Sequence, residues 1–318
     1  MIHENSGRFS LYYLTDLSEQ RYDAFFSFKD PTTSFLSVNV NGRSYRLGES
    51  WSFSTRIEDH QGNPSIVFES PLLLIREVFS LVKTADSSVA NGIKITVKVE
   101  NKNEKDVSVG LRKLIDTHLG EGFGRVPFVT KHQTIKDERI IDSSSDEEYW
   151  VSRGLRLSLM GSIADPEGGR SPDFVHFANW KKLYDAAWKA PYYQGRSFNS
   201  APYSIGDSAV CYYYEPVILS HGEAFSVSIF LTTEDTAGFI KPQTAVKNDS
   251  SKIDNLRNAA DNAERLMNDN FANIYANRDN KLRDLLGILD QYIAGEIQLS
   301  DDDLTEIEQS IIEYRSPK

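Results

Sequence analysis

Short runs of aromatic and β-branched residues, separated by turn residues, fill the first 240 positions of the chain. In Phe35–Val40 the residue types alternate with the period of two that is typical of a half-buried strand. Asn41-Gly42 follows, and because both residues tolerate positive φ, the pair predicts a type I′ hairpin into a strand at residues 45–47. The same pattern predicts further strands at residues 8–14, 51–56, 65–69, 72–82, 93–100, 107–114, 136–141, 153–160, 208–214 and 225–232.

The spacing of these runs predicts the fold class. Strands that recur every 8–12 residues, with polar turns and few helical runs, are typical of an antiparallel two-sheet sandwich, here a large super-sandwich over residues 1–240. The polar turn at residues 101–106 is expected to join residues 93–100 and 107–114 into an antiparallel pair.

The pattern changes after a linker at residues 241–250. Residues 251–318 carry apolar residues at helical spacing, which predicts a C-terminal helical extension. Helices this short are stable only when their apolar stripes are buried. The stripe that includes Ile307 and Ile311 therefore either closes a small bundle with the stripe of residues 282–293 or stays open, as the contact surface for a protein partner or for self-association.

Charge and cysteine content narrow the function classes. The net charge is −11, and residues 248–318 contribute 15 acidic against 8 basic residues, so the acidity is concentrated in this extension. A general nucleic-acid role is disfavoured because phosphate binding needs a basic surface. Cys211 is the single cysteine, which excludes an intramolecular disulfide and a cysteine-based metal site.

No apolar stretch is long enough to span a bilayer, so no transmembrane segment is expected. Residues 1–7 lack the basic and apolar regions of a signal peptide. Two interpretations stay open: a cytoplasmic protein, or an extracytoplasmic one whose signal segment is not part of this sequence.

Scattered motifs in the middle of the chain carry a resemblance to a known family. Asp116-Thr-His-Leu-Gly120, Phe177-Ala-Asn-Trp180 and Asp207-Ser-Ala209 are the main ones. Over residues 35–235 the chain resembles an uncharacterised bacterial family of extracytoplasmic β-sandwich proteins, whose sheet layout is similar to galactose-mutarotase-like super-sandwiches. The resemblance implies this fold and a periplasmic or other extracytoplasmic location. It brings no established catalytic residues.

Candidate catalytic and metal-binding residues form no recognised motif. A mutarotase-type reaction needs an imidazole acid and a carboxylate base on either side of a sugar, but no spacing pairs the available residues, which are His118, His132, His176, His221, Asp116, Glu121, Glu138 and Asp173. No catalytic residue is therefore predicted. Asp116 and Asp207 are expected to organise loops by holding backbone N–H groups. With Glu121 they offer oxygen ligands for calcium, but no calcium-loop motif is present, and no cofactor or metal is expected.

Aromatic residues provide the remaining candidates. Trp180 lies between Phe177 and Leu183, which favours a structural, buried role. Trp188, Tyr192 and Tyr193 have Pro and Gly neighbours, which are typical of a loop. If exposed they would stack on sugar rings or form a protein-binding patch, and if buried they would cap the sandwich.

Together these patterns favour a non-enzymatic structural or protein-interaction component of a bacterial envelope or periplasmic assembly, with flagellum-associated assemblies as one setting. The alternative is a carbohydrate-binding or carbohydrate-processing sandwich, with a sugar as the ligand. No complete catalytic motif is present to decide between them.

Overall fold

The computed structural model describes residues 1–3, 6–16, 21–25, 32–84, 87, 90–117, 119, 127–154, 157–198, 207–234 and 243–244. The chain divides into two compact units, and all of these residues belong to the first, which comprises residues 1–121 and 125–247. The predicted linker and helical extension, with Ile307 and Ile311, lie outside the described residues.

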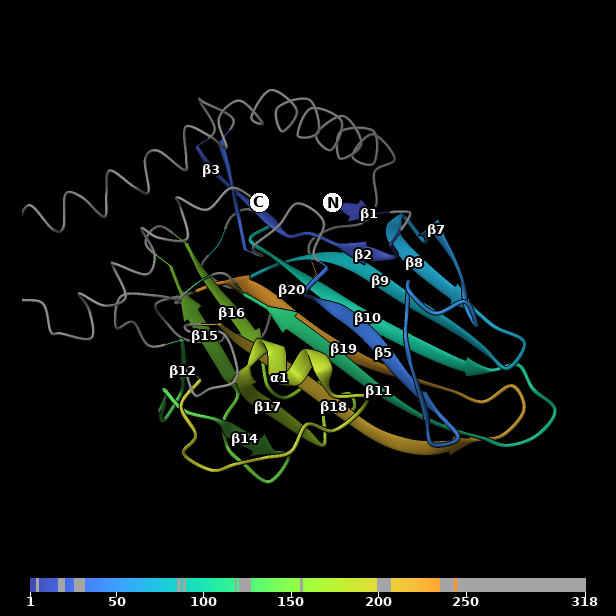
Figure 1. Ribbon diagram of the computed structural model, residues 1–318. Coiled ribbons are helices and arrows are strands. Elements are labelled where there is room, and N and C mark those ends of the chain that lie inside the picture. The colour runs from blue at the N-terminus through green and yellow to red at the C-terminus, as the bar shows by residue number, and fades with distance from the viewer. Residues whose placement is uncertain are drawn as a thin grey trace, which may run out of the picture. The chain divides into compact units, whose positions relative to one another are not determined.

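Two antiparallel sheets form the body of this unit (Figure 1). The large sheet has the order β13 (Thr134–Ile135), β12 (Phe128–Thr130), β15 (Tyr149–Arg153), β16 (Ser158–Ser162), β19 (Ala224–Thr233), β10 (Gly92–Asn101), β9 (Leu73–Lys83), β8 (Asn63–Glu69) and β7 (Ser54–His60), with β20 (Gln243–Thr244) pairing β9. The small sheet has the order β14 (Arg139–Asp142), β17 (Phe174–Asn179), β18 (Ser208–Leu219), β11 (Val107–Asp116), β5 (Phe35–Val40) and β6 (Arg43–Arg46). Two hairpins near the N-terminus pair β1 (Ile2–His3) with β2 (Arg8–Phe9) and β3 (Tyr12–Asp16) with β4 (Arg21–Ala24).

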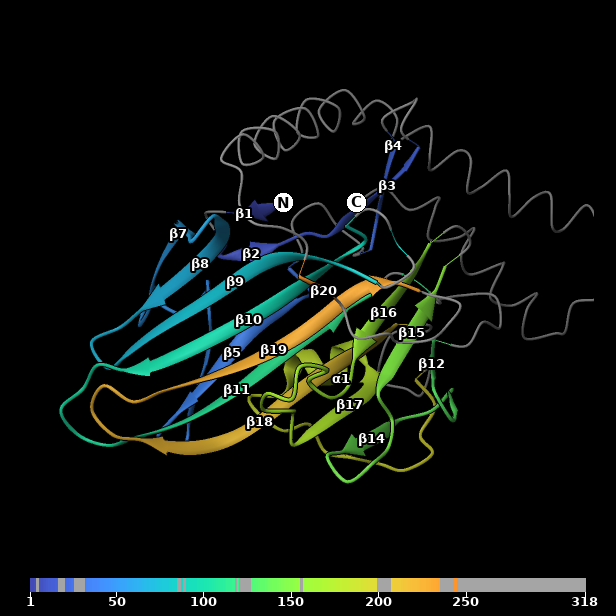
Figure 2. The same ribbon diagram turned by 180° about the vertical axis from the view of Figure 1, so that it is seen from behind.

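The two sheets pack face to face, which confirms the predicted β-sandwich (Figure 2). In β10, Ile95, Val97 and Val99 are buried while the residues between them are at least partly exposed, as the period of two requires. One apolar cluster contains these residues together with Val38 of β5 and Leu111 of β11, so it joins both sheets.

Polar groups also cross the core. Lys113 of β11 binds Glu77 of β9 at 2.5 Å, and both side chains are at most 5% exposed. The indole nitrogen of Trp150 donates to the hydroxyl of Tyr212 at 2.6 Å. Because an unpaired buried polar group is costly, these bonds favour one alignment of the two sheets.

The predicted antiparallel pair of residues 93–100 and 107–114 is wrong. β10 has β9 and β19 on its two sides, so both of its edges are occupied, and β11 instead pairs with β5 and β18 in the other sheet. The turn is therefore an arch between sheets, and the connection from β18 to β19 forms a second one. Asn101 joins the two arches, because its backbone N–H donates to Glu223 O and its side-chain amide donates to Leu219 O.

Local predictions were mixed. Asn41 and Gly42 have φ of 50° and 82°, which confirms the predicted hairpin turn between β5 and β6. The strand predicted at residues 153–160 is instead a hairpin of β15 and β16. The strand predicted at residues 51–56 begins only at Ser54, and Trp51 is fully exposed on the preceding turn.

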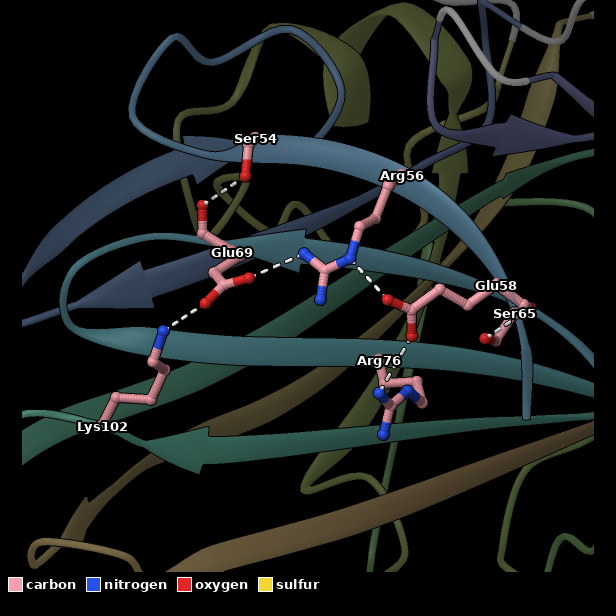
Figure 3. Close-up of polar contacts among 7 residues, drawn as sticks. All are labelled: Ser54, Arg56, Glu58, Ser65, Glu69, Arg76 and Lys102. Atoms are coloured by element: carbon pink, nitrogen blue, oxygen red, sulfur yellow. Dashed lines mark hydrogen bonds and ion pairs between the residues drawn. The ribbon is translucent and has the colours of Figure 1, made fainter. Parts of the chain in front are cut away.

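Charged side chains form a chain of ion pairs on the strands β7, β8 and β9 (Figure 3). Arg56 contacts Glu58 at 2.5 Å and Glu69 at 2.7 Å. These two carboxylates also bind Arg76 and Lys102, respectively. The Arg56–Glu69 pair joins the adjacent strands β7 and β8, where opposite charges favour the pairing. Charges on β7, which ends the main path of the large sheet, also disfavour pairing with another chain.

Candidate functional site

The short helix α1 (Trp180–Asp185) covers the outer face of the small sheet. It begins where Asn179 ends β17, and the Asn179 side chain accepts the N–H of Lys181 as an N-cap. It ends at the buried guanidinium of Arg112, a residue of β11, which donates to the carbonyl oxygens of Leu183 and Ala186. These contacts hold α1 and the segment after it, residues 186–198, against the sheet.

A buried carboxylate lies between this segment and the sheet. Glu138, just before β14, is 3% exposed. Its Oε1 accepts hydrogen bonds from His176 Nε2 at 2.9 Å, Lys182 Nζ at 2.5 Å and the backbone N–H of Tyr193 at 3.1 Å, and its Oε2 accepts a second one from Lys182 at 2.6 Å. Burial alone would raise the pKa of Glu138, but these hydrogen bonds outweigh it and hold the pKa below its usual value.

We call Glu138, His176 and Lys182 the Glu138 network. Its chemistry favours a structural role over a catalytic one. An ionised carboxylate that accepts four hydrogen bonds from three donor groups is already satisfied, so it is a poor general base. Glu138 and His176 also contact each other directly, whereas a mutarotase-type pair would need a sugar between them. Removing one member would leave another buried and unpaired at a large cost in folding free energy. The network therefore holds residues 186–198 firmly in place.

Two neighbouring tyrosines lie over this network. Tyr192 is 39% exposed and Tyr193 is 53% exposed. The rings of Tyr192 and His176 form a T-shaped pair with a centroid distance of 5.9 Å and an interplanar angle of 80°. Lys182 Nζ lies 4.5 Å from the centroid of the Tyr193 ring, and the guanidinium carbon of Arg196 lies 5.5 Å from it. We call Tyr192 and Tyr193 the tyrosine pair. Both side chains are exposed to solvent, and each ring contacts one member of the Glu138 network.

The two predicted tryptophans are partly exposed: Trp180, which was expected to be buried, is the first residue of α1, and Trp188 follows the helix. Trp188 lies edge-on to Tyr213 at 6.1 Å, and its carbonyl oxygen accepts a hydrogen bond from the Tyr213 hydroxyl. Trp180 packs on Tyr184, and its indole nitrogen donates to Thr33 O at 3.0 Å. Both tryptophans are less exposed than the tyrosine pair.

Asp116 and Asp207 form a second group, at the end of β11 and the start of β18. Burial and the neighbouring Asp207 raise the pKa of Asp116 to about 7, and burial raises the pKa of Asp207 to about 6. The Asp116 backbone N–H donates to Ser34 Oγ, and the Asp207 carbonyl accepts the N–H of Trp180. The role of both residues as loop organisers stays a prediction.

The sequence did not predict the Glu138 network. From the sequence, Glu138 and His176 were candidates with no spacing that pairs them. Lys182 lies 44 residues after Glu138, and no motif marked it as a partner. Within the described ranges, no three His, Cys, Asp or Glu side chains are placed to hold a metal ion, which leaves the calcium question untested. No helix among the described residues is long and apolar enough to cross a membrane.

No protein-family model and no curated protein matches the sequence. Similar solved structures include a galactose mutarotase related enzyme from Lactobacillus acidophilus, with 12% identity, a TM-score of 0.37, and coverage of 62% of this chain and 77% of that one. A galactose mutarotase-like protein from Lactobacillus casei shows 10% identity, a TM-score of 0.38, and coverage of 73% and 96%. A polysaccharide lyase shows 10% identity, a TM-score of 0.37, and coverage of 65% of this chain but 26% of its own length.

These comparisons correct the expected function. The prediction of a non-enzymatic envelope component is wrong, because the similar structures are named for carbohydrate enzymes or their relatives. The carbohydrate alternative agrees better with them. A likeness this distant assigns neither an activity nor a site residue, so the function has to be argued from the site itself.

Proposed function

We propose that the protein binds carbohydrate on the tyrosine pair. The observation that carries the proposal is that Tyr192 and Tyr193 are both exposed, while the backbone N–H of Tyr193 is bonded to Glu138 and the ring of Tyr192 contacts the ring of His176. An exposed ring offers an apolar face to the C–H groups of a sugar, and its hydroxyl offers a hydrogen bond to sugar hydroxyl groups.

Rigidity is the second support. Binding costs free energy when side chains and loops must be ordered, and a surface held in place beforehand avoids much of that cost. The backbone N–H of Tyr193 is bonded to a buried carboxylate, and its ring already contacts the ammonium group of Lys182. Two neighbouring exposed rings with no such support would bind more weakly.

Calorimetric titration of the full chain with D-galactose, maltotriose and cellotriose tests the proposal. We expect at least one sugar to bind, and Tyr193→Ala to weaken its affinity at least about ten-fold, the equivalent of 1.4 kcal/mol. Trp51→Ala is the matched control, because Trp51 is an exposed aromatic residue on the turn before β7. It should bind as the wild type does.

Two results would overturn the proposal. One is the absence of binding to all three sugars by the wild-type chain. The other is wild-type affinity in Tyr193→Ala, with a melting temperature that shows the variant to be folded.

A further inference from the structure

His176 lies at the base of the tyrosine pair and is 1% exposed. One edge of its ring, at Nε2, contacts Glu138, and the ring also forms a T-shaped pair with the ring of Tyr192. The other ring nitrogen, Nδ1, is buried and has no hydrogen-bond partner among the described residues. Buried polar atoms of this kind are rare in folded proteins, so this one requires an explanation.

The partner of Nε2 fixes the tautomer of the ring. Glu138 is bound by Lys182 through both carboxylate oxygens, and its lowered pKa keeps it ionised, so it can only accept hydrogen bonds. Nε2 must therefore carry the proton in its contact with Glu138 Oε1. In a neutral imidazole this leaves Nδ1 with a lone pair, and Nδ1 is then an unsatisfied acceptor.

We propose that His176 Nδ1 accepts a hydrogen bond from a hydroxyl group of the carbohydrate that binds the tyrosine pair. The inference rests on the proposed function and adds a polar contact point to it. Because His176 Nδ1 is an acceptor, it selects a ligand with a hydrogen-bond donor. The ligand class is therefore a neutral sugar with a free hydroxyl group beside Tyr192. A ligand that presents only a carboxylate or carbonyl oxygen at this point would be rejected by the lone pair.

Tyr192 controls access to this acceptor. Its ring is the aromatic neighbour of His176, and at 39% exposure it is the less exposed member of the tyrosine pair. For a sugar hydroxyl group to reach the buried imidazole, the Tyr192 side chain has to move, while Tyr193 stays tied to Glu138 through its backbone N–H. One tyrosine then supports the sugar, and the other moves aside to admit the hydroxyl group.

The variant His176→Gln separates the two ring nitrogens. The amide nitrogen of Gln can donate to Glu138 as Nε2 does, but Gln has no acceptor at the position of Nδ1. We expect a melting temperature close to that of the wild type and an affinity for the bound sugar that is about ten-fold lower, because one hydrogen bond is lost. His132→Gln is the matched control, since His132 is 48% exposed and pairs with Asp146. It should leave binding unchanged.

Nitrogen NMR of the histidine-labelled wild type provides a test that does not depend on a variant. During titration with the same three sugars, we expect the Nδ1 resonance of His176 to shift while Nε2 remains protonated. If the sugar binds and Tyr193→Ala abolishes binding, but the Nδ1 resonance does not move, the inference is overturned and the proposed function stands. An Nδ1 resonance that is already hydrogen-bonded without sugar, and unchanged by it, has the same meaning. If no sugar binds the wild type, the proposed function itself fails.

Discussion

Asp116→Asn should stabilise the protein at pH 8 and leave its stability unchanged near pH 4. Burial, together with Asp207, raises the pKa of Asp116 from 3.8 to about 7 in the folded state. The folded state therefore binds more protons than the unfolded state between about pH 4 and pH 7, and stability falls as the pH rises through this window. A rise of about three pKa units is equivalent to about 4 kcal/mol, since one unit is 1.36 kcal/mol. Asn has a similar shape and no charge, so it removes this cost.

Urea unfolding followed by circular dichroism from pH 4 to pH 8 would measure the effect. We expect the gain of Asp116→Asn to grow across the window and to reach on the order of 2–4 kcal/mol at pH 8. Asp142→Asn is the control, because hydrogen bonds from Ser144 lower the pKa of the exposed Asp142. Its contribution to stability is present above the usual pKa of Asp and is lost as the pH falls, so this variant should gain nothing at pH 8. Parallel stability curves for wild type and Asp116→Asn would refute the reasoning.

Three further variants test the core and the network. Glu138→Gln leaves Lys182 buried without its counter-charge and should cost about 3–5 kcal/mol in urea unfolding, and adding Lys182→Met should recover most of that loss. Gly161→Ala places a Cβ atom 2.4 Å from ring atoms of Trp150 and should lower stability by about 1–3 kcal/mol, whereas an unchanged melting curve would show that the ring can move. Asn101→Ala removes the amide that joins the two arches and should cost about 1–3 kcal/mol in the same assay, and a neutral result would mean that water replaces the amide.

The strands were predictable because alternation is a local property. Phe35–Val40 and its Asn41-Gly42 turn have the predicted bounds, since the residues that define them are adjacent in the chain. The predicted half-burial of this strand is wrong, because all six residues of β5 are buried, and Phe35 packs with Leu183 of α1 on the outer face of the sheet. Sheet membership was not predictable in the same way. A short polar turn at residues 101–106 is compatible with a hairpin or with an arch, and the arch forms because β19 occupies the edge of β10 that β11 would have used.

At the candidate site, too, local features were predictable from the sequence and contacts between distant residues were not. Pro and Gly neighbours predicted that Tyr192 and Tyr193 lie in a loop, but not what holds this loop in place. That depends on Glu138 and Lys182, which come from separate elements, and no periodic pattern links them. The raised pKa of Asp116 likewise depends on burial and on Asp207, 91 residues later in the chain, rather than on its neighbours in the loop.

The two stacked arches have a consequence for the order of folding. β10 ends at Asn101 and its partner β19 begins at Ala224. At a synthesis rate of about 5–20 residues per second, one edge of β10 waits roughly 6–25 s on the ribosome for its partner. Contacts so far apart in sequence also make folding slow, typically milliseconds to seconds even for the complete chain. For that interval the nascent chain presents an open strand edge, so its yield in the cell depends on what protects β10 until residue 233 has been made.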